Sequence, residues 1–542
     1  MVLPFQQITQ RFAIALVAVL SSTSMAIAVE PQDTKARLLT DIAFQYADLG
    51  KSDRAIEVLE QGLRLTRAMS SKCFQANPLA RTAGSYFLLG QDALAKQLLA
   101  EAVQTAKKQD ATGCSSSATS PTESLSNRAG EYAEAGHLEF AIDLSSQLGD
   151  PILMAELAGY LEAAGQSERA AKILDQAIVL AMASPQFPSP LLLIAMAESL
   201  RAAEHPTLVP RLLQRSLESI SAKPSSQSPA ELQIHSMLGI ARSFAGIQSN
   251  SQALAVLGRA MSKVQTRPNA EKVQYQVEAA SQYKALGQPR QATEILAAAL
   301  ANAQNLPKDK SLNRESALAS VAEAYAKLGD FEQALKIARS AGKVQGRIFG
   351  YERIAVAYAI AGKSDEAARL AQLGGNRNNT LIEIVRYYLT QKQPDQALKF
   401  VQTHQVKGIA DEVAQGYLKA GQPEQALKIV QNSQPKNQPK NQEKPKNQEM
   451  EWVFPEVARG FAQQKQFNSA LEVAQSINNK TYKIQALVAI AEGYSNIDTA
   501  KPEGVSGLMT HFGNWVQETF GDSDREQAVK ALDQALELAR SL

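Results

Sequence analysis

The amino-acid sequence predicts an all-α solenoid of about 13 antiparallel helix pairs. Three observations lead to this fold class. One residue pattern recurs along the chain at spacings of roughly 29 to 46 residues, which is the range of helical repeats. Apolar side chains in each copy recur at three- and four-residue steps, as on one face of a helix. A Gly in the middle of most copies marks a turn, because Gly readily adopts the left-handed conformation that ends a helix.

The copy around Gly362 shows the repeated unit most fully. Ile354, Ala355 and Tyr358 precede the turn on one helix face, and Ala367 follows it by five residues at the start of a second apolar stripe. A short connection makes the two helices antiparallel neighbours, and the small Ala lets their backbones approach closely. The other copies align on a turn Gly or on a polar residue in its place: Gly50, Gly136, Gly165, Glu204, Gln248, Gly287, Gly329, Lys392, Gly421 and Lys465.

A single helical hairpin cannot bury both of its apolar stripes, so these units must stack on one another. The alternative is a globular helical bundle. Some thirteen copies in the same frame argue against a bundle and for a stacked array.

The recurring residues resemble the tetratricopeptide repeat (TPR) family. The match consists of a Tyr four residues before the turn Gly, as in Tyr358 and Tyr417, and a small Ala five residues after it, as in Ala367 and Ala426. The Pro that usually ends such a repeat is mostly missing. The resemblance implies a right-handed superhelix of helix pairs, whose first helices line a concave surface that binds proteins or peptides.

The N-terminus has the pattern of a secretory signal peptide. Arg11 precedes nine apolar residues, Phe12 to Leu20, and a small-residue cleavage pattern ends at Ala28. The alternative is a membrane anchor, but a spanning helix needs about 20 apolar residues. We therefore expect cleavage near Ala28 and export to the periplasm or the extracellular space, with no transmembrane segment in the mature chain.

Composition and motifs argue against an enzyme and against nucleic-acid binding. The 56 basic and 54 acidic residues leave a formal charge of +2, which is too small an excess to favour a polyanion. The five His are scattered and the two Cys cannot build a four-cysteine zinc site, so we expect no metal and no cofactor. Gly50-Lys-Ser and Gly362-Lys-Ser lack the upstream Gly of a phosphate-binding loop.

Two segments interrupt the array. Repeats occupy 29–431 in about eleven units, and residues 432–449 repeat the motif PKNQ with almost no apolar side chain, which is typical of a disordered loop. About two further units occupy 450–542, with an insertion at 496–523.

The insertion contains an amphipathic pattern, from which an additional helix is expected. Three roles are open: covering the apolar face of the last repeat, docking to a partner, or contact with a membrane. The absence of basic residues on the polar face disfavours a membrane. The candidate cap or docking residues are Leu508, Phe512, Trp515 and Phe520.

An exported chain with only two Cys suggests one disulfide bond. Cys73 precedes the first helix of the second unit and Cys114 follows its second helix, so an antiparallel hairpin places the two side by side. A bridge closing a loop of about 40 residues stabilises by roughly 3–4 kcal/mol in the chain-entropy model.

The resemblance implies that first-helix residues at fixed positions before each turn face the concave surface. Their charges are mixed, which favours a protein or peptide partner over a polyanion. The candidate groove residues are Arg242, Glu278, Glu323, Glu352, Arg353, Glu383, Arg386, Asp411, Glu412, Trp452 and Arg459.

These observations predict an exported, non-enzymatic scaffold that binds a protein or peptide. A factor for cell-envelope assembly or polymer handling is the alternative, disfavoured because few aromatic side chains are available to stack on sugars. An enzyme is the remote alternative, because no catalytic motif is present.

Overall fold

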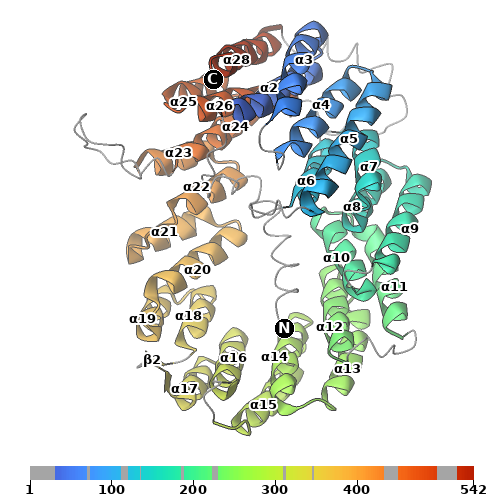
Figure 1. The fold of residues 1–542 in the computed structure, drawn as a ribbon. Coiled ribbons are helices and arrows are strands. Elements are labelled where there is room, and N and C mark those ends of the chain that lie inside the picture. The colour runs from blue at the N-terminus through green and yellow to red at the C-terminus, as the bar shows by residue number, and fades with distance from the viewer. Residues whose placement is uncertain are drawn as a thin grey trace. The chain divides into compact units, whose positions relative to one another are not determined.

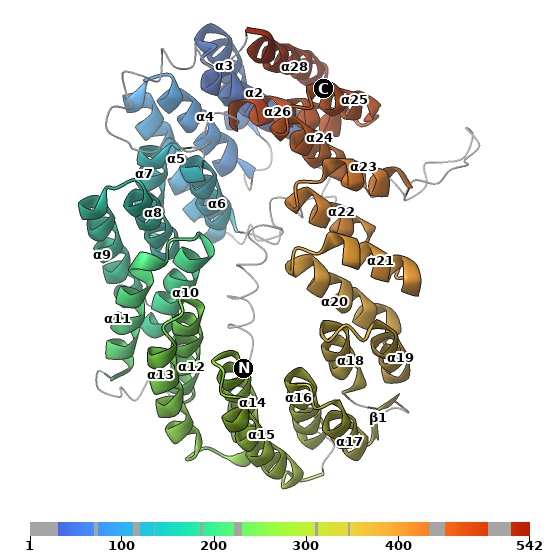
Figure 2. The same ribbon diagram turned by 180° about the vertical axis from the view of Figure 1, so that it is seen from behind.

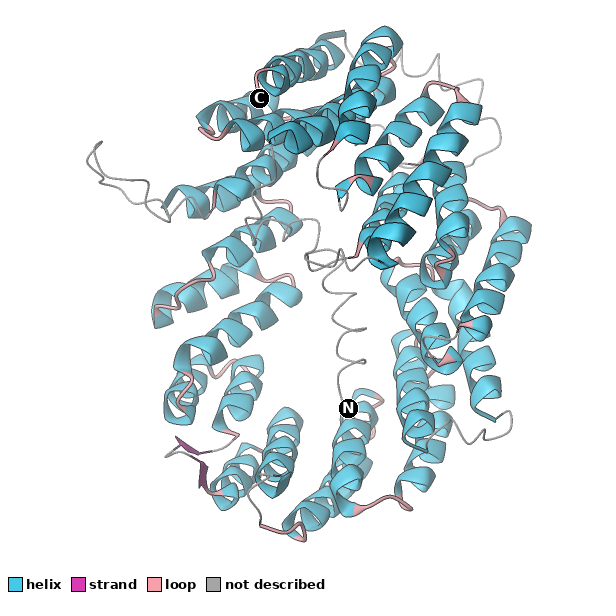
Figure 3. Ribbon diagram, viewed as in Figure 1, coloured by secondary structure: helices cyan, strands magenta, loops and turns pink. Residues whose placement is uncertain are grey.

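The computed structural model describes residues 31–69, 74–111, 120–134, 136–184, 188–221, 230–308, 313–344, 347–348, 350–432, 450–496 and 522–542. In this part of the chain, 26 α-helices follow one another as 13 successive two-helix repeats, which confirms the predicted fold class (Figure 3). Its only strands are a short antiparallel pair, β1 (Lys343–Val344) and β2 (Arg347–Ile348). None of the described helices is long and apolar enough to cross a bilayer.

Several predictions concern residues outside this described part. They are the signal peptide at 1–28, the bridge between Cys73 and Cys114, the PKNQ segment after Asn432, and the candidate helix with Leu508, Phe512, Trp515 and Phe520.

The repeats divide into two compact units. Unit 1 comprises residues up to 180 together with 421–542, and unit 2 comprises residues 181–420. The helices of unit 1 are α2 (Pro31–Asp48), α3 (Ser52–Ala68), α4 (Ala76–Leu88), α5 (Asp92–Ala111), α6 (Pro121–Glu134), α7 (Leu138–Leu148), α8 (Pro151–Ala163), α9 (Ser167–Ala183, whose last turn crosses the boundary), α23 (Pro423–Asn432), α24 (Phe454–Gln463, after the 3-10 helix η3, Glu451–Val453), α25 (Phe467–Ser476), α26 (Lys480–Asn496) and α28 (Asp522–Arg540).

Unit 2 is a continuous run of repeats. Its helices are α10 (Ser189–Ala202), α11 (Val209–Ser221, after the 3-10 helix η2, Pro206–Leu208), α12 (Ala230–Gly246), α13 (Asn250–Val264), α14 (Asn269–Ala285), α15 (Pro289–Gln304), α16 (Asn313–Leu328), α17 (Phe331–Ala341), α18 (Tyr351–Ile360), α19 (Ser364–Gly374), α20 (Arg377–Thr390), α21 (Pro394–His404) and α22 (Ala410–Lys419).

The turns within the repeats lie where the sequence places them. At Gly362 the backbone is left-handed (φ 76°), the Gly362 N–H donates to Ala359 O (2.9 Å), and the Lys363 N–H donates to Tyr358 O (2.9 Å). This hydrogen-bond pattern satisfies carbonyls at the helix end. The four polar residues predicted to replace the turn Gly are also left-handed, with φ of 63°, 60°, 56° and 61° at Glu204, Gln248, Lys392 and Lys465.

An Ala follows most of the turns by five positions and lies at the centre of its repeat. Ala55, Ala141, Ala292, Ala367 and Ala470 are all fully buried. A larger side chain there would push the paired helices apart, because interaxial distance follows the size of the side chains at the contact. The recurrence of Ala is therefore a packing requirement.

The first helices of unit 2 pack directly on one another, α10 on α12, α12 on α14, and so on to α20 on α22 (Figures 1 and 2). Outside its own repeat, each second helix contacts chiefly the first helix of the following repeat, as α15 contacts α16. Closer spacing of the first helices places them on the inner side of the curve within this unit.

Unit 1 brings together segments from the two ends of the described chain. Helix α2 packs against α26 and α28, as well as against its repeat neighbours α3 and α4 (Figures 1 and 2). Helix α2 thus covers a face of the last repeat, a role that the sequence analysis considered for the insertion.

Candidate functional site

The first-helix surface of unit 2 carries ion pairs that join neighbouring repeats. Arg242 on α12 pairs with Glu278 on α14, and Glu323 on α16 lies 3.7 Å from the guanidinium of Arg353 on α18. Farther along the unit, Arg386 on α20 donates to both carboxylate oxygens of a Glu on α22 (2.8 and 2.7 Å). We call these three pairs, Arg242–Glu278, Glu323–Arg353 and Arg386–Glu412, the ion-pair ladder.

The ladder has a fixed register. Each pair joins the residue six positions before the turn of one repeat to the residue nine positions before the turn of the next, as in Arg386 before Lys392 and Glu412 before Gly421. Each of the first helices from α12 to α22 contributes one residue to the ladder. Positions three apart share one helix face, so the six residues lie on corresponding faces of their helices. All six ladder residues belong to the groove predicted from the sequence, but nothing in the sequence analysis indicated that they pair.

Further contacts extend the ladder. Arg386 also donates to Glu383 (2.9 Å), and Arg353 donates to Ser320 Oγ (2.9 Å). On α10, Glu198 accepts from Arg201 and from Ser243 of α12. Glu198 is not among the predicted groove residues, although it lies six residues before the turn at Glu204, the same position as Arg242, Glu323 and Arg386.

The pairs balance charge along this surface. The Arg242, Arg353 and Arg386 side chains are each nearly half exposed, so each pair stabilises the fold by at most about 1 kcal/mol. Hydrogen bonding to Glu412 raises the pKa of Arg386 above its ordinary value, although burial acts in the opposite direction. The result is a polar surface with little uncompensated charge.

The remaining candidate residues are not members of the ladder pairs. A Cβ on Gly374 of α19 would be only 2.7 Å from Glu352 Cγ, which places Glu352 against the second helix of its own repeat. Burial raises the pKa of the Asp411 carboxyl. Two candidates belong to unit 1: Trp452 in η3, and Arg459, which pairs with Glu456 (2.6 Å) and Glu492 (2.7 Å).

A pocket of about 280 Å³ opens between α14 and α16, among the residues of the ladder. Its floor is apolar and is formed by Val277, Ala280, Leu296, Ala324 and Leu328. Its polar lining consists of Glu278, Ser281, Lys284, Ser320, Glu323 and Lys327.

The charged groups of the pocket are engaged with one another or with the backbone. Glu278 pairs with Arg242, Glu323 accepts from Lys327 (2.6 Å), and Lys284 donates to the backbone carbonyl of Lys327. The pocket therefore presents fixed, balanced charge around an apolar floor. Across the described residues, no group of three or more His, Cys, Asp or Glu is placed to hold a metal ion.

Comparison with known proteins adds little beyond the repeat itself. No protein-family model matches the chain, and no curated protein matches it. Among solved structures, Ton1535 from Thermococcus onnurineus NA1 is similar at 15% identity, with 68% of this chain and 98% of that chain covered and a TM-score of 0.25. The pentatricopeptide repeat protein PPR10 from maize matches at 13% identity, with 92% and 80% covered and a TM-score of 0.24.

The TPR domain of P58(IPK) matches at 15% identity, with 78% of this chain and 98% of that chain covered and a TM-score of 0.15. TM-scores this low do not establish a shared overall fold, so the assignment rests on the repeat geometry. That geometry comprises two-helix units, a left-handed turn at the predicted position, a buried Ala five residues later, and first helices packed side by side. The chain is a TPR-like helical solenoid.

In this TPR-like solenoid, the pocket lies on the surface that the first helices share. Its lining comes from α14, α15 and α16, two of which are consecutive first helices. Two carboxylates of the ladder, Glu278 and Glu323, line it.

Proposed function

We propose that this protein is an exported, non-enzymatic scaffold that binds a protein or peptide on the first-helix surface of unit 2. The observation that carries the proposal is the α14–α16 pocket, whose apolar floor opens among balanced ion pairs. Export rests on the signal-peptide pattern of residues 1–28, and the exported chain is proposed to carry the Cys73–Cys114 bridge.

The size of the pocket favours one side chain of a larger partner. Whole small-molecule ligands generally occupy pockets of about 300–1,000 Å³, and this one measures about 280 Å³. The apolar floor suits an aliphatic or aromatic side chain. The paired charges around it suit the polar backbone and mixed charges of a polypeptide, since complementary charges set the register of a protein interface.

Filling the pocket with a large side chain tests the proposal. Peptides are selected from a random displayed library on the full mature chain, and their dissociation constants are measured for the wild type and for Ser281→Trp. Ser281 is exposed and lines the pocket, so the indole should occupy the apolar floor without disturbing the core. We expect the affinity to fall at least about tenfold, which corresponds to about 1.4 kcal/mol.

The matched control is Arg290→Trp on α15. The Arg290 side chain is 95% exposed on a second helix and does not line the pocket, so its replacement should leave the affinity unchanged. Equal losses in both variants, or no peptide enriched at all, would refute a peptide-binding pocket at this site.

A further inference from the structure

The two ends of the described chain meet through specific polar contacts in unit 1. Tyr46 of α2 donates to Asp533 Oδ1 of α28 (2.7 Å), and Gln45 of α2 donates to Glu492 Oε1 of α26 (3.2 Å). The Arg540 guanidinium of α28 lies 2.6 Å from the carboxylate of Glu57 on α3. We call this contact of α2 and α3 with α26 and α28 the join.

Glu492 is the carboxylate at the centre of the join. It pairs with Arg459 of α24 at 2.7 Å and with Arg81 of α4 at 3.5 Å, in addition to its hydrogen bond from Gln45. One side chain therefore links helices from the C-terminal segment, which contains Arg459, to helices from the N-terminal segment, which contains Arg81 and Gln45.

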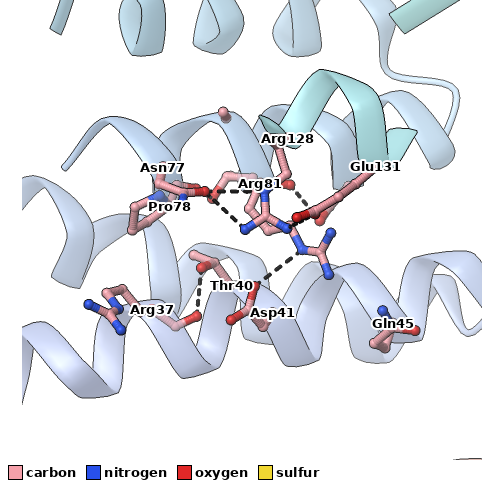
Figure 4. Close-up of polar contacts among 12 residues, drawn as sticks. Arg37, Thr40, Asp41, Gln45, Asn77, Pro78, Arg81, Arg128 and Glu131 are labelled. Atoms are coloured by element: carbon pink, nitrogen blue, oxygen red, sulfur yellow. Dashed lines mark hydrogen bonds and ion pairs between the residues drawn. The ribbon is translucent and has the colours of Figure 1, made fainter. Parts of the chain in front are cut away.

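The N-terminal side of this network is held in place. The Arg81 side chain is only 7% exposed, pairs with Asp41 of α2 at 3.2 Å, and lies 3.8 Å above the ring of Phe44. Figure 4 shows Arg81 reaching from α4 to Asp41, beside Arg128, which donates to Asn77 of α4. Arg81 is thus fixed where it faces Glu492 across the join.

The arginines around Glu492 stabilise its negative charge. Burial alone would raise the pKa of its carboxyl, but Arg459 and Arg81 outweigh burial and lower it. The carboxylate therefore compensates two guanidinium groups at once. Without it, Arg81 and Arg459 would face each other across the join with less compensation, and partly buried like charges are unfavourable.

The join also differs from the contacts between successive repeats. The residues that it connects are 411 to 505 positions apart in the sequence, so its formation carries a large loop-closure cost. Each participating repeat also has extensive packing of its own, α2 against α3 and α26 against α28. In a repeat array such neighbour contacts support folding on their own.

We propose that Glu492 is a latch residue, whose negative charge holds the N-terminal repeats on the C-terminal repeats in a join that opens while the repeats stay folded. Neutralising this one carboxylate releases α2 from α26 and α28. The latch goes beyond partner binding in unit 2 and does not depend on it.

Native-state hydrogen exchange of the full mature chain tests the latch. Glu492→Gln keeps the shape of the side chain and removes its charge. We expect amide exchange to become at least about tenfold faster in α2 and α28, with exchange in α14 and α15 of unit 2 unchanged and the helical circular dichroism retained.

Glu456→Gln is the matched control. Glu456 pairs with the same Arg459 at 2.6 Å, but both residues belong to α24. This variant therefore removes a negative charge beside the same arginine and leaves the contacts of the join in place. Exchange in α2 and α28 should stay within about twofold of the wild type. The latch is wrong if the two variants behave alike, or if Glu492→Gln leaves α2 and α28 as protected as in the wild type.

If Glu492→Gln does not fold, a second variant tests the latch. Arg81→Gln removes the partner on the N-terminal side and leaves Glu492 paired with Arg459. The latch predicts faster exchange in α28, because Arg81 is coupled to α28 through Glu492 of α26 and through α2. Unchanged exchange in α28 of this variant would overturn the proposal.

Discussion

Replacing Tyr132 by Ala should destabilise unit 1 by about 3–5 kcal/mol, the usual cost of removing a large buried ring. Tyr132 on α6 is 1% exposed and packs edge-on against Phe140 of α7, with ring centroids 4.9 Å apart. It also contacts Phe44 of α2 at 5.6 Å, and its hydroxyl donates to the carbonyl of Ala80 on α4 (3.2 Å). One ring thus connects three successive repeats, and its loss leaves a cavity among them.

Native-state hydrogen exchange over α4 to α7 measures this effect. A loss of 3 kcal/mol corresponds to more than about 100-fold faster exchange where it proceeds through opening of these repeats. The control Tyr132→Phe keeps the ring and removes the hydroxyl with its hydrogen bond to Ala80, so we expect a loss of about 1 kcal/mol. If the Ala and Phe variants lose equal stability, the ring does not have this packing role.

The second large effect is expected at Gly493, where α26 approaches α24. A Cβ at this position would lie 2.5 Å from Ala462 Cβ and 3.2 Å from the Ala462 carbonyl carbon. The obstacle includes backbone, so no side-chain rotation relieves it. Gly493→Ala should therefore destabilise the chain by about 1–3 kcal/mol, as overpacked core positions do.

Gly258 of α13 is the control for Gly493, because the same substitution should have the opposite effect on stability there. A Cβ at Gly258 would meet nothing within 4 Å, and the residue lies inside a helix, where Gly costs about 0.5–1 kcal/mol relative to Ala. Gly258→Ala should raise the urea midpoint followed by circular dichroism, and Gly493→Ala should lower it. Shifts of the same sign would contradict the close contact of α24 with α26.

The repeats themselves could be predicted because their requirements are local. A left-handed turn and a small residue five positions later depend only on one hairpin, and even the turns without Gly, such as Lys392 and Lys465, were found by their frame. The ladder was predicted only as single positions. Pairing of Arg242 with Glu278 depends on the rotation between neighbouring repeats, which no residue pattern within one repeat specifies.

The join was not predicted, and the reason is physical. Whether Tyr46 meets Asp533 depends on small rotations summed over all the repeats between them, and Arg81 and Glu492 show no periodic signal that marks them as partners. The repeat pattern predicts a terminal apolar face that needs a cover, and residues of the insertion were one candidate for it. No residue pattern indicates that α2 contacts this face.

The measurement that tests the central proposal most directly is site-specific photo-crosslinking of a selected peptide to the full mature chain. A photoreactive amino acid replaces Ser281 in the pocket in one variant and Arg290 on the second-helix surface in another. The proposed binding surface predicts covalent capture of the peptide at position 281 and none above background at position 290. Capture at position 290 alone, or equal capture at both, would contradict the first-helix surface as the binding surface.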